Sequence, residues 1–268
     1  MDFILENEST IRLSVFAGLF LLMAVLETIR PRRIQRFKRP KRWFSNLGIL
    51  FLGALIARLI LPWAPVGVAL YAEQNSIGLF HHFELIGPAF IALGIIMLDF
   101  MIYVQHVLMH KVPVLWRLHR LHHADLDYDV TTGIRFHPIE IILSLLYKMG
   151  IILITGIDPV AVVLFEVILN GMAMFNHANF RLPLGLDRVL RLIFVTPDMH
   201  RVHHSSIQSE TDSNYGFNIS LWDRFFHTYV AQPQNGHENM TIGLEYFRDP
   251  SDLRLDRLLI QPFKGTTK

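Results

Sequence analysis

Long apolar segments limit this chain of 268 residues to a membrane-spanning helical fold. The first runs from Leu13 to Thr28, and four more cover about residues 44–61, 87–105, 138–156 and 157–176. A helix rises about 1.5 Å per residue, so roughly eighteen residues extend about 27 Å, close to the thickness of a bilayer core. With 51% hydrophobic residues, the chain is also too apolar for a typical soluble protein. We therefore predict an all-α integral membrane bundle of four to five transmembrane helices.

A basic segment, residues 30–42, separates the first two apolar segments. It contains eight Lys or Arg residues and no acidic residue. Because positively charged loops remain in the cytoplasm, this segment predicts a cytoplasmic loop and an N-terminus on the other side of the membrane. Its position between two apolar segments argues against nucleic-acid binding, so we expect no nucleic-acid partner. The sequence MDFILENE before the first apolar segment is acidic, unlike the start of a cleaved signal peptide.

Histidine motifs lie at the cytoplasmic ends expected for these segments. HVLMH contains His106 and His110, and the spacing HxxHH then occurs twice. The two HxxHH motifs contribute His119, His122 and His123, and then His200, His203 and His204. Residues three and four apart share one face of a helix, so each motif can direct two or three imidazoles to one centre. We predict a cytoplasmic helical, His-rich cap that holds a dinuclear metal site, because a single tetrahedral zinc needs only three or four ligands.

The residue types restrict the kind of metal site. The chain has no cysteine, which excludes disulfides and Cys-based zinc or iron–sulfur sites. Imidazole binds zinc, copper, iron and nickel, so the ligand type alone leaves the metal open. A His-rich site beside long apolar helices suggests oxygen activation against an unreactive C–H bond of a lipid.

The motifs and their flanks resemble the fatty acid hydroxylase superfamily, which includes sterol desaturases, C-4 methyl sterol oxidases and alkylglycerol monooxygenases. The resemblance covers about residues 95–230. It rests on Asp99 and Tyr103 before HVLMH, on PVLWRLHRLHHADLDYDVTTGIRFHP, on Asn176-His177, on TPDMHRVHHS and on SNYGFNISLWDRFFHTY. It implies a membrane enzyme with two histidine-bound Fe2+ ions that uses O2 and two electrons to hydroxylate or desaturate a lipid. The sequence shows no haem, flavin or Cys-cluster motif, so we expect an external electron donor as a separate redox partner.

The resemblance implies a set of metal ligands wider than the three motifs. The ligands expected on this basis are His106, His110, His119, His122, His123, His137, His177, His200, His203 and His204. His137 is included because Ala173 occupies a position where some fatty acid hydroxylases carry a histidine. Asp99 lies seven residues before His106 on the same helix face, and we expect it to orient an imidazole. His227 replaces a glycine usual in the family and is not expected to bind metal.

Three further histidines, His81, His82 and His237, are expected at the surface. The expected organisation is an N-terminal transmembrane region over residues 1–94, a hydroxylase-like catalytic domain over 95–230 and a polar C-terminal tail over 231–268. We expect the protein in a bacterial inner membrane, or in the ER membrane if the source is eukaryotic, with the metal site on the cytoplasmic face. Two alternatives remain open: a zinc-dependent membrane enzyme of another type with the same His cage, and a metal carrier.

Overall fold

The computed structural model describes residues 2–265, and the regular secondary structure in this range is helical. Only three isolated β-bridges and no β-strand occur in this range. Five helices are long and apolar enough to cross a membrane, which confirms the predicted all-α membrane bundle. The transmembrane candidates are α2 (Glu8–Ile29), α3 (Arg39–Ile60), α6 (Pro88–Lys111), α8 (Pro138–Thr155) and α9 (Pro159–His177).

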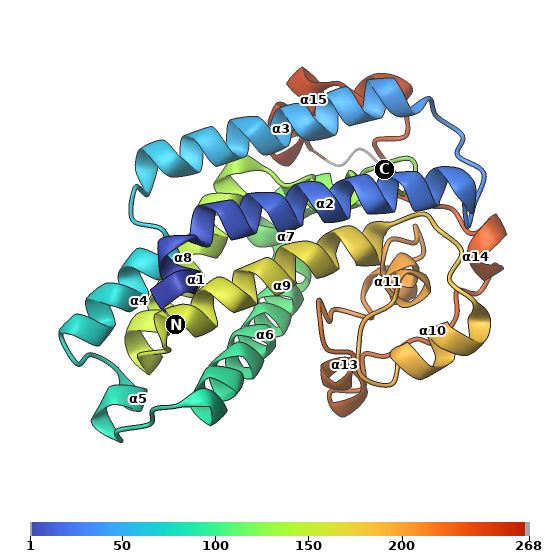
Figure 1. Cartoon of the computed structure of the whole chain (residues 1–268). Helices are drawn as coiled ribbons and strands as arrows, with labels where there is room; N and C mark the ends of the chain where they lie inside the picture. The colour runs from blue at the N-terminus through green and yellow to red at the C-terminus, as the bar shows by residue number, and fades with distance from the viewer. Residues whose placement is uncertain (1, 266–268) are drawn as a thin grey trace.

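The cap is the part of the chain that carries the two HxxHH motifs, residues 113–134 and 184–239. Shorter helices build the cap and connect the long helices (Figure 1). They are α1 (Asp2–Glu6), α4 (Pro65–Gln74), α5 (Leu79–His82), α7 (Pro113–His123), α10 (Leu184–Leu190), α11 (Pro197–His203), α12 (Gln208–Thr211), α13 (Leu221–Phe225), α14 (Gly236–Asn239) and α15 (Leu255–Ile260), with 3-10 turns η1 (Thr132–Ile134), η2 (Pro250–Leu253) and η3 (Gln261–Phe263).

The predicted α8–α9 hairpin is present, and its turn has clear local causes. Gly156 ends α8 with φ of 69°, a conformation that glycine adopts without strain. Asp158 caps α9 by accepting a hydrogen bond from the Val160 amide at 2.7 Å, and Pro159 occupies the first helical position. Gly78 packs closely on this turn, because a Cβ there would lie 2.2 Å from the Gly156 nitrogen.

Helix α9 is the central element of the bundle. It packs against α2, α4, α6 and α11 (Figure 1). In the most apolar 18-residue stretch of α9, 61% of the residues are buried inside the protein, compared with 6% in the corresponding stretch of α2. The exposed apolar face of α2, with Leu21 and Leu22, therefore suits contact with lipid, while α9 links the spans to the cap.

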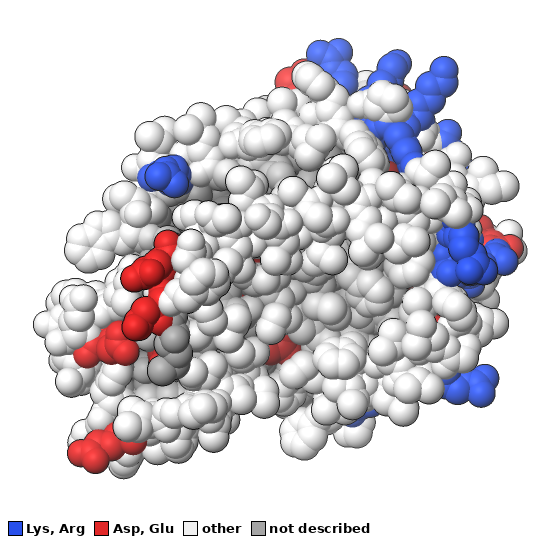
Figure 2. Space-filling view, viewed as in Figure 1, with Lys and Arg blue, Asp and Glu red and all other residues white. Residues whose placement is uncertain are grey.

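Charged residues separate to the two ends of the molecule. Figure 2 shows most Lys and Arg at the end that carries the α2–α3 loop and the cap, with one basic group at the other end, and Asp and Glu mainly at the end that carries α4 and α5. The surface between the two ends is largely uncharged in this view. His81 and His82 lie on α5, at the end away from the cap (Figure 1).

A buried ionic network fixes the cap to α3. Arg42 donates two hydrogen bonds to Asp125, at 2.9 and 2.8 Å, and one to Asp129 at 2.6 Å. All three side chains are buried, and a buried charge is stable only when it is paired. One arginine of the basic segment therefore anchors the loop after α7.

The C-terminal part of the chain is folded onto the rest of the protein. Helix α15 packs against α3, and η3 packs against α7. His237, which we expected at the surface, is buried, and its Nε2 lies 3.7 Å from Asp198 Oδ2. The surface prediction for His237 is wrong, because the polar composition of the tail did not reveal that α14 packs against α11.

Candidate metal centre

Nine histidines form two adjacent groups in the buried junction between the spans and the cap. Within each group, the nitrogen atoms that could bind metal lie within 4.8 Å of one another. The first group contains His106, His110, His119, His123 and His203, and the second contains His122, His177, His200 and His204.

Helix periodicity explains how one motif serves both groups. In α7, His119 and His123 are four residues apart and face the first group, while His122 faces the second. His203 and His204 are adjacent in sequence, so their side chains diverge at the end of α11, one to each group. This alternation places the two groups side by side.

The contacts within the second group are those of atoms converging on one point. His177 Nε2 lies 3.1 Å from the Nε2 atoms of His122, His200 and His204. One ring nitrogen offers either one hydrogen or one lone pair, so three such contacts cannot all be hydrogen bonds. Two nitrogens bound to one ion at about 2.1 Å and at right angles stand about 3.0 Å apart. The spacing therefore fits shared coordination of a metal ion.

The first group repeats this geometry. His106 Nε2 lies 3.1 Å from the Nε2 atoms of His119 and His203. His110 and His123 complete the group, with ring centroids 4.7 Å apart. The first group thus offers five nitrogens and the second offers four, enough for two metal ions.

Backbone carbonyls fix the tautomer of several imidazoles. A ring whose Nδ1–H donates to a carbonyl must present the lone pair of Nε2 to the centre. The Nδ1 atoms of His106, His177 and His203 lie 2.7, 2.7 and 2.6 Å from the carbonyl oxygens of Tyr215, Ala173 and Ser213. These acceptors therefore fix the orientation of the three rings, with Nε2 toward the centre.

Glu140 orients a further ligand and was not predicted from the sequence. Its Oε1 accepts a hydrogen bond from His119 Nδ1 at 2.6 Å, the arrangement in which a carboxylate raises the basicity of a metal-bound imidazole. It lies in the first turn of α8, two residues after Pro138. The available signal was an acidic residue at the start of a span that follows the histidine motif.

Burial keeps the imidazoles of the cap neutral. Loss of solvent, followed by the neighbouring imidazoles, holds the pKa of His122, His123, His200 and His204 well below its usual value. Burial and the neighbouring His119 lower the pKa of His203 to about 3. A neutral imidazole is the form that binds metal, so the chemistry of this donor set fits a transition-metal pair.

His137 lies outside both groups. Its Nδ1 accepts a hydrogen bond from the Ile139 amide at 3.2 Å, so it caps the N-terminus of α8. Its Nε2 donates to the Leu259 carbonyl at 3.2 Å. Both ring nitrogens are engaged in these hydrogen bonds. His137 therefore caps α8 and does not lie with the histidines that could bind metal, where we expected it.

Asp99 and His227 occupy positions that their local contacts explain. Asp99 Oδ2 accepts a hydrogen bond from Trp222 Nε1 at 2.7 Å, so the carboxylate holds α13 against α6. Within residues 2–265 Asp99 has no hydrogen bond to an imidazole, in contrast to the expected orienting role. His227 is exposed and has φ of 58°, which explains why glycine suits this position.

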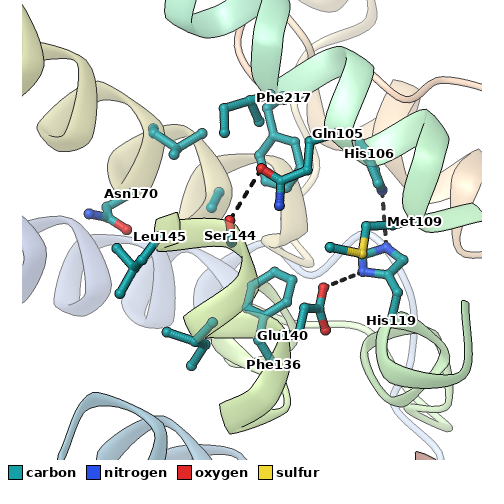
Figure 3. Close-up of a pocket in the computed structure, with 15 residues that line it drawn as sticks. Gln105, His106, Met109, His119, Phe136, Glu140, Ser144, Leu145, Asn170 and Phe217 are labelled. Atoms are coloured by element: carbon teal, nitrogen blue, oxygen red, sulfur yellow. Dashed lines mark hydrogen bonds and ion pairs between the residues drawn. The ribbon is translucent and has the colours of Figure 1, made fainter. Parts of the chain in front are cut away.

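A cavity of about 180 Å³ lies between α6, α8 and α9 and reaches the first histidine group. His106 and His119 border it at the metal end, and Figure 3 shows Glu140 and Phe136 beside them. Most other lining residues are apolar, such as Leu145. A largely apolar cavity among membrane helices can hold the hydrocarbon part of a lipid next to the metal groups.

The chain is similar in sequence to several known proteins. The family model for fatty acid hydroxylases matches residues 91–228, just over half of the chain. Ornithine lipid hydroxylase OlsE of Rhizobium tropici is 29% identical over 227 residues, which cover 82% of this chain and 67% of that protein. Human (Homo sapiens) alkylglycerol monooxygenase is 30% identical over 149 residues, which cover 55% of this chain and 31% of that protein.

A cholesterol 25-hydroxylase-like protein of Danio rerio is 27% identical over 143 residues, which cover 52% of this chain and 54% of that protein. The chain thus spans about two thirds of the first relative and about a third of the human one. No solved structure matches the chain significantly.

Proposed function

The chain belongs to the fatty acid hydroxylase family, as its histidine motifs predicted, and from this we propose that it is a membrane-bound di-iron oxygenase that hydroxylates a C–H bond of a lipid. One observation carries the proposal: nine buried imidazoles form two adjacent groups at the end of an apolar cavity. The names of the relatives, which include a lipid hydroxylase and a monooxygenase, favour hydroxylation over desaturation.

We assign the nine grouped histidines as the iron ligands and leave His137 out of the set. Five nitrogens would hold one ion and four the other. Two iron ions held there would supply the oxygen activation that breaking an aliphatic C–H bond requires. The chain itself orients the imidazoles through Glu140 and the carbonyl acceptors and keeps them neutral by burial.

The chain also positions the substrate and excludes water. The lipid lies in the cavity between α6, α8 and α9, with the reacting carbon toward His106 and His119. Phe136 stacks on His122 with ring centroids 4.6 Å apart, and Phe217 lies 5.2 Å from His106. These aromatic rings shield the centre from water, which would otherwise compete for the site.

Electrons come from a separate donor in this proposal, because the sequence has no cysteine for an iron–sulfur cluster and no haem or flavin motif.

The separation of charge between the two ends supports a cytoplasmic location for the centre. Lys and Arg gather at the end that carries the cap, and positively charged ends remain in the cytoplasm (Figure 2). A bacterial inner membrane is the location we propose.

The test is to purify the full chain and to measure its metal content, its O2 consumption and its effect on cellular lipids. We expect about two iron ions per chain, as the donor set for two ions implies, and a lipid product heavier by one oxygen atom. His122→Ala should abolish the product, while His82→Ala, on exposed α5, should leave it unchanged. Stoichiometric zinc without O2 uptake, or a product that persists in His122→Ala, would overturn the proposal.

A further inference from the structure

The cavity beside the first histidine group contains polar side chains that the metal chemistry does not use. Gln105 on α6, and Ser144 and Asn170 on the facing spans α8 and α9, line the same cavity (Figure 3). Polar side chains within membrane-spanning segments are energetically costly, so their presence in one cavity calls for a partner. All three are neutral, which distinguishes them from a site for a phosphate or a carboxylate.

Gln105 is fixed so that it presents a donor. Ser144 Oγ donates a hydrogen bond to Gln105 Oε1 at 3.3 Å. The carbonyl end of the amide is thereby occupied, and the Gln105 NH2 group has no acceptor among residues 2–265. Asn170 is exposed at the cavity, and its side chain likewise has no hydrogen bond in this part of the chain.

Glu140 presents an acceptor to the same cavity. Its Oε1 is occupied by His119, but Oε2 is buried and has no hydrogen-bond partner among the described residues. The residue as a whole is only 5% exposed. An unpaired buried oxygen of this kind is destabilising unless a ligand donates to it.

The distances along the helices place this donor and this acceptor close to the metal groups. Gln105 directly precedes His106, and Ser144 lies four residues, about 6 Å along the helix, after Glu140. A polar group bound between them is therefore within a few bonds of the carbon that faces His106 and His119. A carbon in the middle or at the end of a long alkyl chain would leave these polar side chains against hydrocarbon.

We propose that Gln105, Ser144 and Glu140 form a polar binding site, with Asn170 at its outer side, that selects lipids carrying a hydroxyl or a secondary amide near the oxidised carbon. Such a group accepts from the Gln105 NH2 and donates to Glu140 Oε2. An ester or an ether only accepts, and leaves Glu140 Oε2 unpaired. The inference rests on the proposed lipid hydroxylation and names the substrate class of that site.

The test measures binding to the full, iron-loaded protein in nanodiscs and does not depend on turnover. Tritiated 1-dodecanol is the probe, and unlabelled 1-dodecanol, N-methyldodecanamide, methyl dodecanoate and tridecane compete with it, with empty nanodiscs as the background. We expect the alcohol and the amide to compete at least about tenfold better than the ester and the alkane, the size of one hydrogen bond to a charged or buried group.

Variants assign the preference to residues. Gln105→Leu should reduce the preference for the alcohol over tridecane by about threefold or more, since the hydrogen bond from Gln105 is lost, and Ser144→Ala should reduce it in part. The preference over methyl dodecanoate depends on donation to Glu140 Oε2 and should persist in both variants. Gln74→Leu, at the exposed end of α4, is the matched control and should keep the full preference. Iron content equal to that of the wild type shows that the metal groups are intact in each variant.

Equal competition by all four lipids, or a preference over tridecane that is unchanged in Gln105→Leu, would overturn the inference. These outcomes are separable from the proposed function. O2-dependent hydroxylation without the binding preference would overturn only the substrate class, whereas the preference without O2 uptake would overturn only the hydroxylase proposal.

Discussion

The orientation and basicity of the metal-binding imidazoles depend on single side chains outside the histidine motifs. Glu140 is the clearest case, because it is the carboxylate that holds His119. Glu140→Gln removes the negative charge but keeps the shape, so the basicity of His119 falls. We expect iron affinity to fall about 10- to 100-fold, measured as iron retained per chain during titration with a chelator.

The control for this variant is Glu73→Gln on the exposed side of α4, which should retain iron like the wild type. Equal retention in Glu140→Gln would show that the carboxylate does not support the metal ligand. The measurement uses iron content and is independent of how lipids bind in the cavity.

His237 makes the stability of the cap depend on pH. Burial, against the opposing attraction of Asp198, lowers its pKa to about 3, whereas the unfolded chain has the ordinary value of about 6.5. The unfolded state therefore binds more protons below about pH 6.5, and the stabilising contribution is lost as the pH falls toward about 3. We expect His237→Gln to show a weaker loss of thermal stability than the wild type over this range. Parallel curves for the two proteins would contradict the assignment.

His227 is a position where the side chain opposes the backbone. A residue other than glycine in the left-handed region costs about 1–2 kcal/mol, and His227 is exposed, so its side chain contributes little packing. We expect His227→Gly to raise the free energy of unfolding by about 1 kcal/mol in thermal unfolding experiments. Gly236→Ala, at φ of 66°, should shift it in the opposite direction.

The ligand positions show which part of the site the sequence can predict. Helical spacing grouped the three motifs, and His177 joined them because α9 ends at the cap. His137 did not, since its ring caps α8, and no spacing rule distinguishes a capping histidine from a ligand. Glu140 was missed because its contact with His119 joins two helices, α7 and α8. The sequence of neither helix shows how the two are placed relative to each other.

The spans are joined by an ionic contact within the apolar region. Lys148 on α8 donates to Glu166 on α9 at 2.6 Å, and Arg12 on α2 contacts the other oxygen of the same carboxylate at 2.5 Å. Lys148 and Glu166 are buried, so each charge depends on its partner. One acidic residue thus connects three of the five long helices.

We expect Lys148→Met to destabilise the protein by about 3–5 kcal/mol, because it leaves Glu166 with only the partly exposed Arg12 as a partner. The double variant Lys148→Met/Glu166→Gln should recover most of this loss, since the unpaired buried charge is then gone. Thermal unfolding in detergent measures both. A double variant as unstable as the single one would show that the contact is not ionic in effect.

Element boundaries could be predicted where proline, glycine and apolar periodicity coincide, as in the α8–α9 hairpin. Element boundaries could not be predicted where a transmembrane helix continues into the cap. Helix α6 extends to Lys111, past the end expected near Gln105, because its last turns are buried by α7 and carry His106 and His110. The fold of residues 231–265 also escaped prediction, since their polar composition hides contacts with α3 and α7.

At the scale of the whole molecule, the charge separation predicts the orientation in the membrane. The chain has no cysteine, so single-cysteine variants report topology without background. We expect Lys38→Cys, in the α2–α3 loop, to react with a membrane-impermeant maleimide only in inside-out vesicles. Asn75→Cys, at the end of α4, should react in intact spheroplasts. The reverse pattern would place the metal centre on the outer side.

The metal ligands come from α6, α7, α9 and α11, and this arrangement affects how long the protein survives in the cell. His106 and His203 are 97 residues apart in the sequence and meet because the cap packs on the spans. On the di-iron assignment, binding of the two ions stabilises the packing of the cap on the spans, so we expect a chain made without iron to be less stable and more readily cleaved by membrane proteases. The amount of enzyme then follows the iron supply after synthesis, without any dedicated sensor.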